Sequence, residues 1–407
     1  MKVPAEMCIK CKASKMLCGW KRCPLLEKIK IAPRFAEIGE DFFGPSPSVF
    51  VGRFGYPNVF VGPMATISPE TTEKKITDSP SGWFGTDYMN IIEMRSLTIR
   101  SKHKENIFSR SRIVSDTQDL ALAKKPTDIE LGFAKKPVYK ISLSDVTQPM
   151  GPSALLRKLR VTENISIKRK VENIVNDELK TTEQSKMLYD AGEDVYKITT
   201  VLSSGLLGAD DKKKIVPTRW SITATDDILT KNMITEVKKN KIINDYLVFE
   251  SEYLGNHFLI LLTPDQWEYE GFEAWSPRSF WSQNLAKPII VPEYEPYKGR
   301  TTYADKQGGG YYAARFGVVE YLHKRKKQAR AVVFREISEK YVVPLGVWVV
   351  RETARNAMKN KPMKFETLGD ALKHIGSKLS IPIDEYKKNS IILKRRTLKD
   401  FLVSKKY

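Results

Sequence analysis

The chain has 407 residues, of which 41% are hydrophobic and 29% are charged, a composition typical of globular proteins and too apolar for a disordered chain. No run reaches the 18 or more apolar residues that a membrane-spanning helix requires, and the first residues are charged, so we expect neither membrane insertion nor export. The formal net charge of +20 favours polyanionic partners such as nucleic acid or an acidic membrane surface.

All four cysteines of the chain lie near its amino terminus with the spacing C-x2-C-x6-C-x4-C, at Cys8, Cys11, Cys18 and Cys23. Four thiols can form two disulfides, but a chain without an export signal is expected in a reducing compartment, where such clusters more often bind metal. Four thiolates are the ligand set of a closed structural zinc site, which leaves no position for a catalytic water. The alternative is an iron–sulfur cluster, because a Cys-Pro pair like the one at Cys23 also occurs in iron–sulfur proteins. The sequence therefore predicts a four-cysteine zinc module over residues 1–30.

Basic residues concentrate at the two ends of the chain. Residues 1–30 hold eight basic and two acidic side chains, and residues 387–407 hold eight basic and one acidic. Lys21 and Arg22 stand among the cysteines, where they either contact nucleic acid or compensate the negative charge of metal-bound thiolates.

The body of the chain alternates between patterns typical of strands and of helices. Two short apolar runs, 48–53 and 58–61, predict a hairpin, and the mixed three- and four-residue spacing of apolar residues over 151–192 predicts helices. A loop is expected over 203–217, and core strands over 246–250 and 258–262.

An unusual stretch of alternating aromatic and acidic residues covers 265–275. Rings that stack on a base and carboxylates that bind a ribose or act as a general base would make a nucleotide pocket, to which a neighbouring cation would add a phosphate contact. The candidate residues are Glu268, Glu270 and Glu273, with Arg219 and Trp220. The alternative is an amphipathic surface element with its aromatic residues packed inward and its acids in water.

Three prolines punctuate residues 287–300, which we predict to be a linker between a main domain at 31–286 and a smaller one at 301–392. In the smaller domain we expect helices over 311–327 and 366–379 and strands over 330–337 and 347–350. The basic run from Lys324 through Arg325 and Lys326 to Lys327 fits a contact to a DNA backbone and equally a solvated helix end. The predicted class is mixed, α/β or α+β, in two domains.

The sequence does not decide whether the protein is an enzyme. The four histidines are far apart in the sequence, there is no P-loop motif, and no cysteine remains outside the cluster, so three common kinds of active site are disfavoured.

The basic tail over 393–407 carries Leu398, Phe401 and Leu402 at a spacing that places all three on one face of a helical turn. Such a hydrophobic cluster either docks a flexible peptide in a pocket of another protein or packs on the chain's own body.

The stretch from Cys8 to Leu25 resembles the opening of the archaeal Nre family of DNA repair proteins. The resemblance continues at Gly151–Ser153, Pro217–Ser221 and Gly308–Arg315. Membership would imply a cytoplasmic archaeal protein linked to DNA damage tolerance, whose carboxy-terminal peptide binds the sliding clamp.

The clamp-binding motif of such proteins has a glutamine, an aliphatic residue three positions later and two aromatic residues at the end. In this sequence Leu398 matches the aliphatic position and Phe401 the first aromatic, whereas Arg395 replaces the glutamine and Leu402 the second aromatic. We therefore expect a DNA repair factor that binds DNA and the clamp, the latter more weakly than an ideal motif would. An enzyme acting on nucleotides or damaged DNA ends, or an RNA-binding factor, is the alternative.

Overall fold

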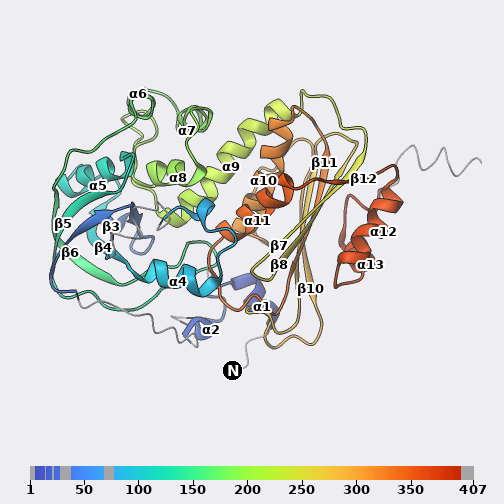
Figure 1. Cartoon of the computed structure of the whole chain (residues 1–407), viewed down its shortest axis with the longest axis horizontal. Coiled ribbons are helices and arrows are strands. Elements are labelled where there is room, and N and C mark those ends of the chain that lie inside the picture. Colours follow the sequence, from blue (N-terminus) through green and yellow to red (C-terminus); the bar gives the residue numbers. More distant parts are fainter. Residues whose placement is uncertain (1–4, 14, 21–22, 28–37, 68–77, 396–407) are drawn as a thin grey trace, which may run out of the picture. The chain divides into compact units, whose positions relative to one another are not determined.

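The computed structural model describes residues 5–13, 15–20, 23–27, 38–67 and 78–395 (Figure 1). The chain divides into two compact units. Unit 1 comprises Met1–Leu25, Met233–Val342 and Val349–Tyr407, and unit 2 comprises Leu26–Asn232 and Val343–Trp348. The main division of these compact units falls within helix α9 (Thr218–Val237), and the predicted linker, the proline-rich segment 287–300, belongs wholly to unit 1. That segment instead contains strand β10 (Ile289–Glu295) at the edge of a sheet, where proline is tolerated.

Unit 2 contains a six-stranded sheet with the strand order β1-β5-β6-β4-β3-β2, in which only the β4–β6 pair is parallel. Its strands are β1 (Asp41–Ser46), β2 (Ser48–Val51), β3 (Asn58–Thr66), β4 (Thr98–Asn106), β5 (Thr127–Phe133) and β6 (Ser153–Val161). The predicted hairpin is confirmed, because β2 and β3 pair as antiparallel neighbours.

The described helices of unit 2 include α4 (Tyr88–Ser96), α5 (Arg112–Leu122), α6 (Arg169–Asn176), α7 (Thr181–Asp190) and α8 (Val195–Ser203), with a 3-10 turn η1 (Pro80–Gly82). The Ser111 hydroxyl accepts a hydrogen bond from the Val114 N–H and so caps the start of α5. The apolar face of α5 packs on β2, β3 and β6, where Leu120 and Ala121 join the core of the unit.

Unit 1 contains a second six-stranded sheet with the order β10-β9-β11-β8-β7-β12, in which β9 and β11 are parallel. Besides β10, its strands are β7 (Tyr246–Tyr253), β8 (Asn256–Thr263), β9 (Tyr269–Trp275), β11 (Arg330–Ile337) and β12 (Met363–Phe365). Its helices include α1 (Ala5–Cys11), α10 (Gly309–Lys324), α12 (Leu368–Lys378) and α13 (Ile383–Asn389), while α2 (Pro24–Glu27) and α11 (Trp348–Lys359) cross the limits of the units.

Helices cover both faces of the unit 1 sheet (Figure 1). On one face, Phe272 of β9 and Phe334 of β11 pack with Tyr386 of α13 in an apolar core that includes α12. Side chains of a strand alternate between faces, so Glu273 lies on the opposite face, close to Gly310 at the start of α10. All seven residues of β9 are buried because helices cover both faces of the sheet.

The face toward α10 contains buried charge. The Glu295 carboxylate binds the Arg315 guanidinium and accepts hydrogen bonds from the Tyr311 hydroxyl at 2.6 Å and the Trp267 indole N–H at 3.3 Å. The side chains of Glu295 and Arg315 are each 2% exposed. The charges are tolerated inside the protein because each is paired and hydrogen-bonded.

The mixed α and β class is confirmed, and two local predictions are wrong. Residues 153–161 form strand β6 rather than the start of a helix. A β-bulge between β5 and β6 allows Leu156 and Leu159 to face the core although they are three residues apart, which imitates helical spacing. Residues 347–350 were predicted as a strand, but α11 begins at Trp348. Among the described residues, no helix combines the length and the apolar character needed to cross a membrane.

Candidate functional site

The four cysteines line one pocket of about 140 Å³ in unit 1. Cys8 and Cys11 come from α1, and Cys18 and Cys23 from the segment that follows it. None of the four described cysteines is joined in a disulfide. Trp281, on the loop after β9, is also part of the lining.

The backbone after α1 turns sharply to bring the second pair of cysteines back toward the first. Lys12 and Met16 have left-handed backbone angles with φ of 45° and 48°, and Gly19 has a φ of 75°. The Lys12 N–H donates to the Cys8 carbonyl at 2.8 Å and so closes the end of the helix. This position usually holds glycine, because a side chain with positive φ costs about 1 kcal/mol.

The electrostatic environment of the four thiols affects how well the pocket can bind a cation. Burial raises the pKa of the Cys8 thiol, and the nearby Cys23, Cys11 and Cys18 raise it further by repulsion. A bound dication would reverse this, because thiolates bind metal in their deprotonated form. The donor chemistry fits zinc, although the described residues contain no group of three or more His, Cys, Asp or Glu side chains already arranged to hold a metal ion.

The side chain of Lys12 connects the cysteine segment to the sheet of unit 1. Its ammonium group lies 2.5 Å from Glu273, and Arg335 binds the other oxygen of the same carboxylate at 2.6 Å. Arg335 in turn donates to the Asn256 side-chain oxygen at 2.6 and 3.0 Å. Gly310 is required nearby, since a Cβ there would lie 2.5 Å from a Glu273 oxygen. Glu273 is therefore fully engaged by two cations.

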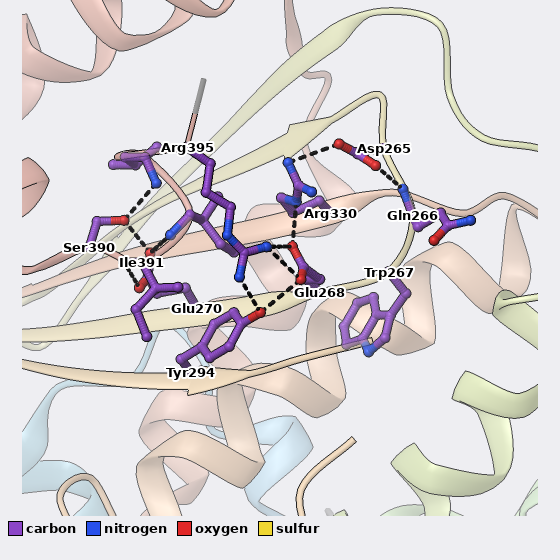
Figure 2. A network of polar contacts seen from close by, with 12 residues as sticks. Asp265, Gln266, Trp267, Glu268, Glu270, Tyr294, Arg330, Ser390, Ile391 and Arg395 are labelled. Carbon is purple, nitrogen blue, oxygen red and sulfur yellow. Dashed lines mark hydrogen bonds and ion pairs between the residues drawn. The ribbon is translucent and has the colours of Figure 1, made fainter. Parts of the chain in front are cut away.

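Glu268 and Glu270 lie on the opposite side of β9 from Glu273, in the network shown in Figure 2. The Glu268 carboxylate pairs with Arg330 at 2.8 Å, and both of its oxygens accept from Arg395, each at 2.8 Å. The Tyr294 hydroxyl donates to Glu268 at 2.7 Å. Burial acts to raise the pKa of Glu268, but the hydrogen bonds from Arg395 and Tyr294, together with the charges of Arg330 and Arg395, outweigh it, so this pKa is lowered.

Glu270 holds the segment that follows α13 against the sheet (Figure 2). Its carboxylate accepts hydrogen bonds from the Ser390 hydroxyl, from the Ile391 N–H at 2.6 Å and from the Ile392 N–H at 3.3 Å. Burial raises the pKa of Glu270, and these hydrogen bonds oppose the increase without cancelling it.

The five residues proposed for a nucleotide pocket thus occupy different settings. Glu268 and Glu270 share one face of the unit 1 sheet, Glu273 lies on the other, and Arg219 and Trp220 belong to unit 2. The alternative expectation, acids in water, is wrong for β9, because Glu270 is fully buried and Glu273 is 2% exposed. The acids are buried because arginine, lysine and backbone N–H groups bind them, and nothing in the local sequence identifies those distant partners.

The other predicted contact residues are only partly described. Lys324 ends α10 and pairs with Glu320 at 3.1 Å, and the Arg325 guanidinium lies 5.6 Å from the centre of the Tyr321 ring. Lys326 and Lys327 follow on the surface. Lys21, Arg22, Leu398, Phe401 and Leu402 lie outside the described residues.

Comparison with known proteins covers nearly the whole chain. Two family models match it: archaeal Nre, N-terminal, over residues 17–282, and archaeal Nre, C-terminal, over residues 295–402. The boundary between the two matched regions falls near the predicted linker, whereas the compact units divide within α9.

Three curated relatives are similar along most of their length. The DNA repair protein NreB of Archaeoglobus fulgidus is 37% identical over 400 residues, which cover 97% of this chain and all of the relative. NreA of the same organism is 37% identical over 369 residues, covering 90% and 92%, and NreA of Haloferax volcanii is 33% identical over 370, covering 88% of each. No solved structure matches the chain. From its cysteine segment to its last helices, the chain belongs to the archaeal Nre family.

Proposed function

We propose that this protein acts in DNA repair in the cytoplasm and reaches its sites of action by binding the sliding clamp. The observation that carries the repair role is similarity over the full length to proteins named for DNA repair, since the match with the first relative covers all of that protein. The net charge of +20, concentrated toward the two ends, supports contact with a polyanion.

The clamp contact is proposed for residues 395–402. Leu398 and Phe401 occupy the aliphatic and first aromatic positions of the motif, and their apolar side chains would provide most of the buried area in a clamp pocket. Arg395, in the position of the usual glutamine, is the one motif residue whose contacts are described, and it binds Glu268.

The test is binding of the purified archaeal sliding clamp to the intact chain and to matched variants. We expect Phe401→Ala to abolish binding and Val403→Ala, just outside the motif, to leave it unchanged. A chain ending at Arg395 keeps the described contacts of the tail and should lose clamp binding with its fold intact. Unchanged affinity in Phe401→Ala, or equal losses in both point variants, would reject the recruitment proposal.

We further propose that Cys8, Cys11, Cys18 and Cys23 hold one structural zinc ion. When bound, the ion would fix the turn after α1 by joining its two pairs of thiolates. Metal analysis of protein purified without oxygen should find one zinc per chain in the wild type and none in a Cys11→Ser, Cys18→Ser variant. If the analysis finds iron and sulfide at stoichiometric level, the cluster is an iron–sulfur site and the zinc assignment is wrong.

The proposal includes no catalytic step. Glu268, Glu270 and Glu273, the acids that the sequence offered for chemistry, are all engaged by cations or by backbone N–H groups.

A further inference from the structure

Three aromatic side chains that the proposed clamp contact does not involve are exposed at one end of the unit 2 sheet. Phe54 and Tyr56 lie in the turn between β2 and β3 and are 74% and 45% exposed, and Trp220, in the first turn of α9, is 43% exposed. The Tyr56 and Trp220 rings are in contact, with centroids 5.1 Å apart. Large rings are normally buried, so a cluster of exposed ones indicates a binding surface.

The local structure holds these rings in place without covering them. Gly55, with φ of 85°, makes the turn possible, because a Cβ there would lie 2.8 Å from the Asn58 carbonyl oxygen. The Val51 N–H of β2 donates to the Thr218 hydroxyl at 3.0 Å and so fixes the start of α9 beside the hairpin.

Two arginines accompany the rings. The Arg53 guanidinium lies 4.7 Å from the centre of the Phe54 ring, and Arg219 precedes Trp220. Burial lowers the pKa of Arg53, and repulsion from Arg219 lowers it further. The charge of Asp145 acts to raise the pKa of Arg53. Among the described residues, however, neither arginine has a carboxylate within ion-pair distance. The positive end of the α9 dipole lies at the same place.

Such a combination matches the chemistry of an unpaired strand of DNA. The exposed faces of rings stack on bases, and an excess of positive charge attracts phosphates. A duplex offers its phosphates but hides the faces of its bases, so it would use the arginines and not the rings.

We propose that Phe54, Tyr56 and Trp220, with Arg53 and Arg219, form a platform that binds single-stranded DNA by stacking on its bases and pairing with its phosphates. This platform deepens the proposed role in DNA repair by naming the form of DNA that is bound. It is independent of the clamp motif, and its test contains no clamp, so either proposal can fail without the other.

The test is fluorescence anisotropy of a labelled oligo-dT of about twelve nucleotides, long enough to span one single-strand site, titrated with the full chain. We expect Trp220→Ala and Phe54→Ala each to weaken binding at least about fivefold, since one base–ring stack contributes about 1–3 kcal/mol. Trp220→Phe, which keeps a ring, should restore most of the affinity. The matched control is Phe43→Ala, which removes a ring that is 64% exposed on β1, at the other end of the strand order.

Salt dependence separates the arginines from the rings. Arg219→Gln should reduce the slope of log affinity against log salt concentration by about 0.7, the value for one phosphate contact on a single strand, whereas Phe54→Ala should leave the slope unchanged. Circular dichroism confirms that each variant is folded.

Three outcomes would overturn the platform. These are unchanged affinity in both folded variants Trp220→Ala and Phe54→Ala, a loss in Phe43→Ala as large as theirs, and binding of a duplex as tight as that of oligo-dT. Tighter binding of oligo-rU than of oligo-dT would contradict the choice of DNA.

Discussion

Arg395 belongs both to the proposed clamp motif and to the network on the unit 1 sheet, which leads to a quantitative prediction. To enter a clamp pocket as part of a peptide, Arg395 would have to leave Glu268, so the ion pair subtracts from clamp affinity. Glu268→Gln removes the negative charge without changing the tail. The prediction is that this variant binds the clamp more tightly than the wild type.

The magnitude follows from the geometry of the pair. Arg395 Nη1 donates to both oxygens of the Glu268 carboxylate at 2.8 Å, but the Arg395 side chain is 43% exposed, so water screens the interaction. We therefore assign it about 0.5–1 kcal/mol, toward the upper end for exposed pairs. Since each 1.4 kcal/mol is tenfold in affinity, Glu268→Gln should tighten clamp binding about two- to fivefold.

Isothermal titration calorimetry with the purified clamp measures this change. Arg395→Gln should give a larger gain, because it breaks the same pair and also restores the glutamine of the motif. The control is Glu385→Gln, which breaks an exposed pair with Lys388 on α13 and should leave clamp affinity unchanged. Equal affinities of Glu268→Gln and the wild type would refute the competition. Absence of clamp binding by all of the variants would instead refute recruitment itself.

Other predictions concern stability. Glu295→Gln should lower the free energy of unfolding by about 3–5 kcal/mol, because it breaks a buried ion pair, whereas Glu385→Gln should change it by less than about 0.5; urea denaturation compares them, and equal losses would contradict the role of burial. The pKa of Glu270 is raised in the folded state, so its contribution to stability is fully present below its ordinary pKa of 4.5 and is lost as pH rises through the raised value. Thermal melts between about pH 4 and 8 should therefore favour Glu270→Gln increasingly over the wild type, and a constant difference would refute this sign. Gly310→Ala should destabilise the protein by about 1–3 kcal/mol, because the new Cβ meets a buried carboxylate oxygen, while Gly369→Ala in α12 has room and should be neutral or stabilising; a neutral Gly310→Ala would contradict the close approach.

Patterns confined to one element were predictable from the sequence. The β2–β3 hairpin follows from two apolar runs and a glycine turn, and β11 spans Arg330–Ile337 as its β-branched residues indicate. The failures arise where distant contacts decide. The bulge opposite β5 gives β6 a three-residue spacing of core leucines, and four apolar residues at 347–350 cannot distinguish a strand from the start of a helix.

The candidate sites show the same division. Cysteine spacing predicted one four-thiol zinc site, which stays a prediction, and the structure places Cys8 and Cys23 in the lining of one pocket. The partners of Glu273 are not predictable from local sequence, since Lys12 is 261 residues away. For the same reason the sequence suggested that Trp220 shares a pocket with acids that in fact belong to the other unit. The ring that contacts Trp220 is Tyr56, in the turn of a hairpin whose strands were predicted but whose contacts were not.

The two outer strands of the unit 1 sheet bear on how the protein behaves at high concentration. A sheet edge with free N–H and C=O groups can pair with a strand of another molecule and so start aggregation. Here β10 carries Pro292, which has no N–H to donate, and β12 is only three residues long. Both edges are thereby poor templates for intermolecular pairing, which lets the protein keep an open sheet without closing it into a barrel.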